Sequence, residues 1–216
     1  MSIGYDGREL IRDVSFELAP GECVLLAGPN GTGKTTLLRA LAAEGVVLIP
    51  TNIPKVKGFT VEAFVRTGCY RESDWRGRIS KEVEGRMEEA LKMLGIGELK
   101  GRDISTLSDG EFQKACLATG LTRRAEVLLL DEPTAHLDVE NRIDVLRTLR
   151  EVARKTGTAV LFSSHDLHDA LQVADRVFVL TRDGRFLASA SFISSEVEKS
   201  KADVLQAAFA TLSDLR

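Results

Sequence analysis

Cysteine is scarce in this chain of 216 residues. The three cysteines, Cys23, Cys69 and Cys116, are widely spaced and odd in number, and none belongs to a C-x-x-C pair. The pattern therefore indicates neither a disulfide framework nor a cysteine zinc site. We expect the protein to work in a reducing compartment.

Long hydrophobic runs and a charge excess are also missing. No stretch approaches the roughly 18 apolar residues of a membrane-spanning helix, and the start MSIGYDGREL lacks the basic and apolar regions of a signal peptide. The formal net charge of −3 gives no general attraction to nucleic acid or acidic lipid. We expect the chain itself not to cross a bilayer, and to recognise its partners through local surfaces.

The sequence does contain enough apolar residues, 44%, to fill a substantial core. Short apolar runs alternate with helical patterns, which is typical of an α/β fold with a mainly parallel sheet flanked by helices. We predict strands at residues 23–27, 46–49, 127–130, 159–162 and 177–180, with a tight turn at Asp183 and Gly184.

A helical subdomain is predicted inside the sheet domain. Apolar residues recur at helical spacing from Val83 to Leu94, and Gly95 can end that helix. We interpret residues 59–124 as a helical subdomain, inserted between the two parts, 1–58 and 125–216, of the sheet core. The tail at residues 196–212 is predicted to be a helix with a charged start.

The strongest chemical signal is GPNGTGKT at residues 28–35, which fits G-x-x-x-x-G-K-[ST] between a predicted strand and a predicted helix. Its glycines let backbone N–H groups approach a phosphate chain, and the helix start adds partial positive charge. Lys34 can reach the outer phosphates, and the Thr35 hydroxyl can ligate Mg²⁺. The alternative, a glycine-rich turn without function, does not explain the Lys-Thr pair. The predicted nucleotide contacts here are Gly28, Pro29, Asn30, Gly31, Thr32, Gly33, Lys34, Thr35 and Thr36.

Two acids follow the apolar run VLLL at residues 127–130. Such acids are often solvated loop residues or helix caps, but ligands gather at the carboxyl ends of strands in an open parallel sheet. We therefore predict that Asp131 holds Mg²⁺ and that Glu132 orients or deprotonates the attacking water. Further upstream, Ser108 and Glu111 in TLSDGEFQKA form the pattern of a capping box at a helix start.

Taken together, these motifs resemble those of the ATPase subunits of ABC transporters. The phosphate loop is shared by many NTPases, whereas LSDGE followed by LLLDEPTAHLD and SSHD is far more specific. The resemblance implies a P-loop NTPase fold that hydrolyses ATP with Mg²⁺. It also implies a head-to-tail homodimer, in which Ser108 and Gly110 of one copy contact the terminal phosphate of ATP held by the other. Asp109 replaces a glycine of the family motif, and we expect its side chain to point away from ATP.

Further family roles transfer residue by residue. The resemblance makes His165 the switch residue at the terminal phosphate, Asp138 part of the loop that couples the two sites, and Tyr5 the aromatic that stacks on adenine. Thr51 stands where the family has a magnesium-sensing glutamine, so Thr51 or Asn52 would supply a weaker contact to metal or water. His136 and His168 are expected at the surface.

The resemblance extends to a transport role. FTVEAFVRTGCY, from residue 59, and RMEEALKMLGIGELKGRDISTLSDGE, from residue 86, look most like subunits that power uptake of iron-siderophore complexes, heme or cobalamin. Such a subunit would lie on the cytoplasmic face of the inner membrane under permease subunits, with a solute-binding protein as an indirect partner. The surface at residues 51–70 would receive a permease helix.

Two alternatives remain open at this point. A soluble ABC ATPase of DNA repair or the ribosome should show a second nucleotide domain, a coiled coil or a basic face, and the sequence has none of these. A degenerate regulatory nucleotide binder is suggested by Asp109 and Thr51. The chain retains the residues that hydrolysis needs, which argues against this alternative: Lys34, Asp131, Glu132 and His165.

Overall fold

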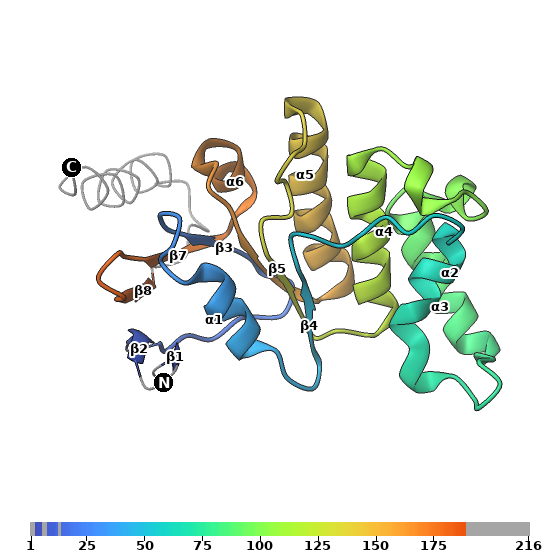
Figure 1. Ribbon diagram of the computed structural model, residues 1–216, viewed down its shortest axis with the longest axis horizontal. Coiled ribbons are helices and arrows are strands. Elements are labelled where there is room, and N and C mark those ends of the chain that lie inside the picture. Colours follow the sequence, from blue (N-terminus) through green and yellow to red (C-terminus); the bar gives the residue numbers. More distant parts are fainter. Residues whose placement is uncertain (1–2, 6–7, 13, 189–216) are drawn as a thin grey trace.

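The computed structural model describes residues 3–5, 8–12 and 14–188, so the helix predicted at 196–212 lies outside the described residues. Its centre is a six-stranded sheet with the order β4-β5-β6-β3-β7-β8 (Figure 1). All neighbouring strands are parallel except β7 and β8, which are antiparallel. The strands are β3 (Cys23–Ala27), β4 (Val46–Ile49), β5 (Val127–Leu130), β6 (Ala159–Ser163), β7 (Arg176–Leu180) and β8 (Phe186–Ala188).

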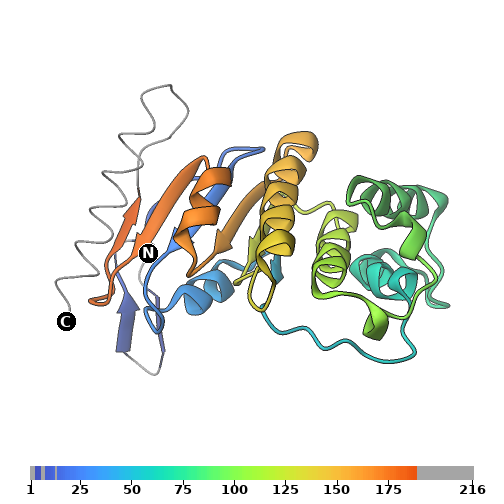
Figure 2. The same cartoon turned by 90° about the horizontal axis from the view of Figure 1, so that it is seen from above.

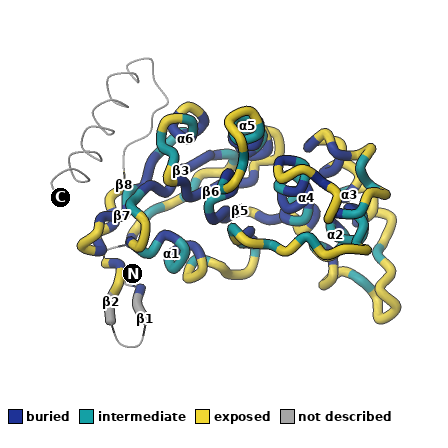
Figure 3. Tube along the Cα trace, turned by 45° about the horizontal axis from the view of Figure 1, so that its top comes forward, coloured by how far each residue is buried: buried dark blue, intermediate teal, exposed yellow. Residues whose placement is uncertain are grey.

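The five predicted strands are confirmed to within one residue at each end. Every residue of β3 and β6 is buried, because helices cover both faces of a parallel sheet and the strands therefore read as continuous apolar runs (Figure 3). The predicted turn is present as well. Gly184 has a φ of +78°, and the Thr181 N–H donates to the Arg185 carbonyl at 3.0 Å where β7 turns into β8.

Helices cover the two faces of the sheet. Helix α1 (Lys34–Leu41) buries Leu37 and Leu38 in one cluster together with residues of β3 and β7, such as Leu26 and Phe178. Helices α5 (Val139–Thr156) and α6 (Leu167–Val173) cover the other face (Figure 2). A separate antiparallel pair, β1 (Ile3–Tyr5) and β2 (Arg8–Ile11), lies beside α1.

Between β4 and β5 the chain forms helices. These are α2 (Val61–Arg66), η1 (Thr67–Glu72), α3 (Lys81–Met93), η2 (Gly97–Leu99), η3 (Ile104–Thr106) and α4 (Asp109–Thr122). The apolar positions predicted for α3 are all buried, and Gly95, just beyond it, has a φ of +67°. Helix α4 packs on α2 and α3 and also on α5 and β4, so it joins this helical part to the sheet.

The elements place the candidate site at one edge. In Figure 1 the carboxyl ends of β4 and β5 and the amino-terminal ends of α1, α4 and α5 lie on the same side of the molecule. None of the helices in the described part of the chain combines the length and apolar character that a membrane crossing needs.

Candidate functional site

The phosphate loop connects β3 to α1. Gly28 packs so closely against β7 that a Cβ atom there would lie 2.5 Å from the Leu180 carbonyl oxygen, which explains why this position needs glycine. The Lys34 ammonium donates to the carbonyl oxygens of Gly28 at 2.8 Å and Pro29 at 3.2 Å, so the loop curls around its own lysine. The Thr32 hydroxyl also donates to Pro29, at 2.9 Å.

The loop opens onto a cavity of about 420 Å³. Its lining residues are Asn30, Gly31, Gly33, Lys34, Thr35, Thr36 and Glu132. The backbone N–H groups at the start of α1 and the lysine make this cavity suitable for an anion. Burial lowers the pKa of Lys34 from its ordinary value, partly opposed by the carboxylates of Glu132 and Asp131. A bound phosphate would stabilise the charged lysine, so it would offset that burial.

Asp131 is held from both sides at the end of β5. Its carboxylate accepts a hydrogen bond from the Thr35 hydroxyl at 2.8 Å and another from the Ser163 hydroxyl at 2.9 Å. Its own N–H donates to the Ile49 carbonyl at 3.0 Å. The hydroxyl oxygen of Thr35 and the carboxylate of Asp131 are hard oxygen donors, the type that Mg²⁺ prefers, so the residues present fit this ion.

Glu132 adopts a strained backbone conformation next to Asp131. Its φ is +48°, in the left-handed region that side-chain-bearing residues adopt at a cost on the order of 1 kcal/mol or more. The Ser163 hydroxyl accepts its N–H at 2.8 Å, and its carboxylate lies 3.2 Å from His165 Nδ1. This conformation lets the Glu132 side chain line the phosphate-loop cavity while Asp131 contacts Thr35.

Five of the predicted residues therefore lie in one region: Lys34, Thr35, Asp131, Glu132 and His165. Ser163 was not predicted as a site residue, although it is fully buried and contacts both acids. The reason for its contacts is the strand order, because β6 lies between β3 and β5. Its only sequence signal is that a polar residue ends an apolar strand.

Thr51 lies directly after β4. Its hydroxyl donates to the main-chain carbonyl of Asp131 at 2.8 Å, which attaches this position to the backbone of the candidate site. A contact of Thr51 with metal stays a prediction. His136 and His168 are exposed, as predicted.

Ser108 and Gly110 lie elsewhere, at the start of α4. The predicted capping box is confirmed: the Ser108 hydroxyl accepts the Glu111 N–H at 3.1 Å, and the Glu111 carboxylate accepts the Ser108 N–H at 2.8 Å. A Cβ atom at Gly110 would lie 2.8 Å from Asn141 Oδ1, and Asn141 is in turn bonded to Asp138. In Figures 1 and 2 this end of α4 is separated from α1 by β4 and β5.

Tyr5 ends β1, which contacts α1. The next strand also lies close to the phosphate loop, since a Cβ atom at Gly33 would be 3.3 Å from Ile11 Cδ1. The strand pair is thus beside the nucleotide loop, and stacking by Tyr5 stays a prediction.

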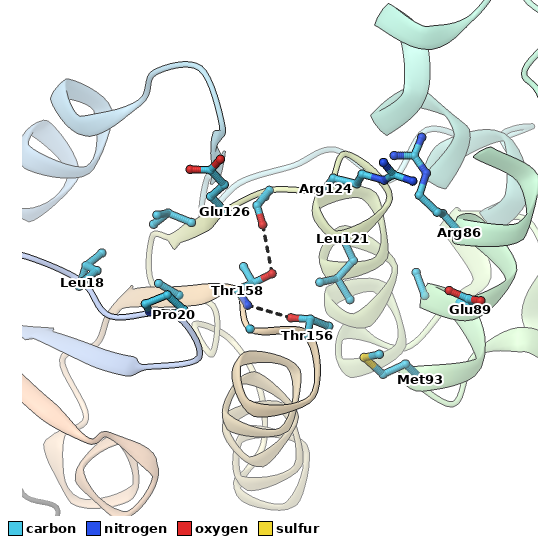
Figure 4. Close-up of a pocket in the computed structure, with 15 residues that line it drawn as sticks. Leu18, Pro20, Arg86, Glu89, Met93, Leu121, Arg124, Glu126, Thr156 and Thr158 are labelled. Carbon is cyan, nitrogen blue, oxygen red and sulfur yellow. Dashed lines mark hydrogen bonds between the residues drawn. The ribbon is translucent and has the colours of Figure 1, made fainter. Parts of the chain in front are cut away.

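A different cavity, of about 540 Å³, lies at the amino ends of β5 and β6, with Leu18 and Pro20 on one side and α3 and α4 on the other (Figure 4). Leu121, Met93 and Leu18 contribute apolar surface to it. Its polar residues serve the fold: the Thr158 hydroxyl donates to the Ala125 carbonyl, and the Thr158 N–H donates to Thr156. Since ligands of open α/β sheets bind at the carboxyl ends of strands, this cavity is on the wrong side for the phosphate chemistry.

Comparison with known proteins decides the family. The ABC transporter family model matches residues 11–135, more than half of the chain. The chain belongs to this family. Its relatives include the hemin import ATP-binding protein HmuV of Streptomyces coelicolor, which is 39% identical over 87% of this chain and 75% of the relative. The zinc import ATP-binding protein ZnuC of Roseobacter denitrificans is 35% identical over 83% of this chain and 72% of the relative.

Solved structures support the same fold. A nucleotide-free ATP-binding cassette of an ABC transporter has a TM-score of 0.77 and 21% identity, with 92% of this chain and 91% of that chain covered. The cbiO1 protein of Clostridium perfringens, part of the cbiONQ ABC transporter complex, also has a TM-score of 0.77. It is 21% identical, with 99% of this chain and 97% of that chain covered. The predicted family and fold class are confirmed. The chain is thus an ATP-binding ATPase of a family whose ATPases work with membrane permease subunits.

Proposed function

We propose that two copies of this chain close around ATP and Mg²⁺, and that hydrolysis powers import through membrane permease subunits. The observation that carries the proposal is the hydrogen-bonded network in which Thr35, Asp131, Ser163, Glu132 and His165 converge on the phosphate loop. This network connects the start of α1 to the carboxyl ends of β5 and β6. Its side chains would face a nucleotide in the cavity without a rearrangement of the fold.

Residues 28–36 would bind the phosphates. Their backbone N–H groups and the amino end of α1 match a chain of anionic oxygens, and Lys34 would leave its carbonyl contacts for the outer phosphates. Thr35 and Asp131 would hold Mg²⁺, which supplies charge neutralisation to the terminal phosphates. Tyr5 would stack on the base.

The chemical step would depend on Glu132 and His165. The Glu132 carboxylate would accept a hydrogen bond, and then a proton, from the attacking water. The contact with His165 would orient that carboxylate, and the bond from its N–H to Ser163 would fix its backbone. His165 is exposed, which leaves its ring free to contact the terminal phosphate in the closed state.

The second copy would complete the site. A helix start carries a partial positive charge that favours an anion, and at the start of α4 Ser108 adds a hydroxyl that caps the Glu111 N–H in the single chain. Within one chain the start of α4 is separated from the phosphate loop (Figure 1), so the triphosphate that this helix start binds would be held by the partner. The neighbouring Asp138 and Asn141 would lie at the same interface.

Relatives named for hemin and petrobactin import support the proposed cargo. Besides the hemin and zinc import proteins, the relatives include the petrobactin import ATP-binding protein FpuC of Bacillus anthracis, which is 32% identical over 82% of this chain. We propose cargo of the iron-siderophore, heme or cobalamin type, delivered by a solute-binding protein. The chain would lie on the cytoplasmic face of the inner membrane. Val56 and Tyr70, which are 54% and 81% exposed, would form part of the permease contact.

The test is Glu132→Gln. Wild-type protein should hydrolyse ATP only with Mg²⁺, whereas the variant should bind ATP, lose turnover, and elute as a dimer in light-scattering chromatography. ADP is the matched control and should leave the variant monomeric. A variant that turns over at the wild-type rate would remove Glu132 from the mechanism, and one that stays monomeric with ATP would refute the dimer. A regulatory binder would bind ATP with no turnover in the wild type.

A further inference from the structure

Lys55 reaches from the segment between β4 and α2 to the amino-terminal end of α4. Its ammonium donates to Asp109 Oδ1 at 2.7 Å and to the Leu107 carbonyl at 2.9 Å. It also lies 5.3 Å from the centre of the Phe112 ring, a cation–π distance. These three contacts surround Ser108, the residue proposed to meet the partner's nucleotide.

We infer that Lys55 is a positioning residue for this end of α4. It neutralises Asp109 and holds the turn at Leu107, so that Ser108 and Gly110 face the triphosphate of the second copy without an uncompensated carboxylate beside it. The inference rests on the proposed ATP-bridged dimer.

The charges of the first turn of α4 support this role. Glu111 is already engaged: its carboxylate accepts the Ser108 N–H and lies 3.7 Å from an Arg102 nitrogen. Asp109 is 62% exposed, so without a cation its full charge would face the region where a triphosphate approaches. The family motif has glycine at this position. The pairing with Lys55 therefore provides the compensation that the departure to aspartate requires.

The segment that carries Lys55 also packs Ile53 against the core cluster that contains Phe112 and Cys116 of α4. A cavity of about 540 Å³ lies between the segment and α4, lined by residues 50–55 on one side and by Phe112, Gln113 and Cys116 on the other. The bonds from Lys55 span this region. An exposed ion pair contributes little to folding stability, so its loss should act on association and leave the fold intact.

The experiment measures the ATP-dependent dimer in the Glu132→Gln background by sedimentation. At about 0.05 M NaCl, where charges are weakly screened, Lys55→Met should weaken the dimer about tenfold, equivalent to about 1.4 kcal/mol. At about 0.5 M NaCl the deficit should fall to about twofold, because salt screens the exposed Asp109 charge. Adding Asp109→Asn should restore the dimer to within about twofold of its parent at both salt concentrations.

Lys114→Met is the matched control. It removes a Lys114–Asp144 ion pair of the same length, 2.7 Å, and of similar exposure, from the same helix, but away from its amino-terminal end. The dimer should be unchanged. In hydrolysis assays with Glu132 intact, Lys55→Met should raise the KM for ATP while kcat at saturation stays within about twofold, since the chemical groups are untouched.

Three results would overturn the inference: an unchanged dimer in Lys55→Met, equal losses in Lys55→Met and Lys114→Met, or no rescue by Asp109→Asn. A parent Glu132→Gln protein that never dimerises with ATP is a different result. It would refute the proposed dimer, and the role of Lys55 with it.

Discussion

Ser163 holds both acids of the candidate site, and its replacement by alanine separates their positioning from nucleotide binding. The fully buried hydroxyl donates to Asp131 and accepts the Glu132 N–H. A hydrogen bond to a charged group contributes about 1.5–3 kcal/mol, and a neutral one about 1 kcal/mol. The two bonds together therefore contribute about 2.5–4 kcal/mol to folding stability, and they also fix the geometry of the two acids.

Ser163→Ala should lower the melting temperature by about 5–15 °C, since 1 kcal/mol shifts a domain of this size by about 2–4 °C. Loss of the bond that fixes the strained Glu132 should also reduce kcat by about 10- to 100-fold, equivalent to about 1.4–2.7 kcal/mol in the activation barrier. The affinity for ATP without Mg²⁺ should change less than kcat, because the two hydrogen bonds of Ser163 go to Asp131 and Glu132, whereas residues 28–36 would bind the phosphates. Steady-state ATPase assays, nucleotide titration and thermal unfolding measure the three quantities.

The adjacent serine is the control. Ser164 is also buried, but within the described part of the chain its hydroxyl bonds with the backbone of Asp166, at 3.0 and 3.1 Å, and not with either acid. Ser164→Ala should therefore keep kcat within about twofold of the wild type. Equal losses of kcat in the two variants, or a wild-type kcat in Ser163→Ala, would refute the positioning of Glu132 by Ser163.

Three further outcomes are expected. Lys34→Ala should weaken ATP binding about 10- to 100-fold, because a hydrogen bond to a charged group contributes about 1.5–3 kcal/mol, and unchanged binding in a fluorescence titration would contradict the assignment of the loop. Burial lowers the pKa of Lys34, so as pH rises the lysine loses its proton in the folded protein before it does so in the unfolded chain. The buried charge of Lys34 therefore destabilises the fold at neutral pH, and this destabilisation disappears as pH rises toward 10.5. Lys34→Met should therefore raise the free energy of unfolding in urea at neutral pH, and this gain over the wild type should shrink as pH approaches 10.5. A gain that does not change with pH would contradict the lowered pKa of Lys34. Gly120→Val should lower the melting temperature, since a Cβ atom there would lie 2.6 Å from Leu128, whereas substitution of exposed Gly97, with open space around it, is the control.

The sequence predicted the sheet well because parallel strands covered on both faces must be apolar along their whole length. Val127–Leu130 and Ala159–Ser163 show this plainly: apolar residues fill them up to the polar position where the chain reaches the candidate site. The phosphate loop was predictable for a related reason, since a short motif contains the glycines, the lysine and the hydroxyl together.

Contacts between distant residues were not predictable from the same patterns. Ser163 meets Asp131 only because β6 lies between β3 and β5, and an apolar run does not define its neighbours in a sheet. Lys55 meets Asp109, which lies 54 positions further along the chain. The sequence did indicate that Asp109 departs from the family motif, but not which cation compensates it.

These two unpredicted contacts belong to one continuous arrangement. Asp131 is bonded through its backbone carbonyl to Thr51, and Thr51 begins the segment whose Lys55 is bonded to Asp109 and Leu107. The segment is therefore attached at one end to the acid proposed to hold Mg²⁺ and near its middle to the end of α4 proposed to face the partner's nucleotide. A displacement of β4 or of this segment would move both attachments together. Thr51, although it lacks the reach of glutamine, thus retains a direct connection to the hydrolytic site through the backbone of Asp131.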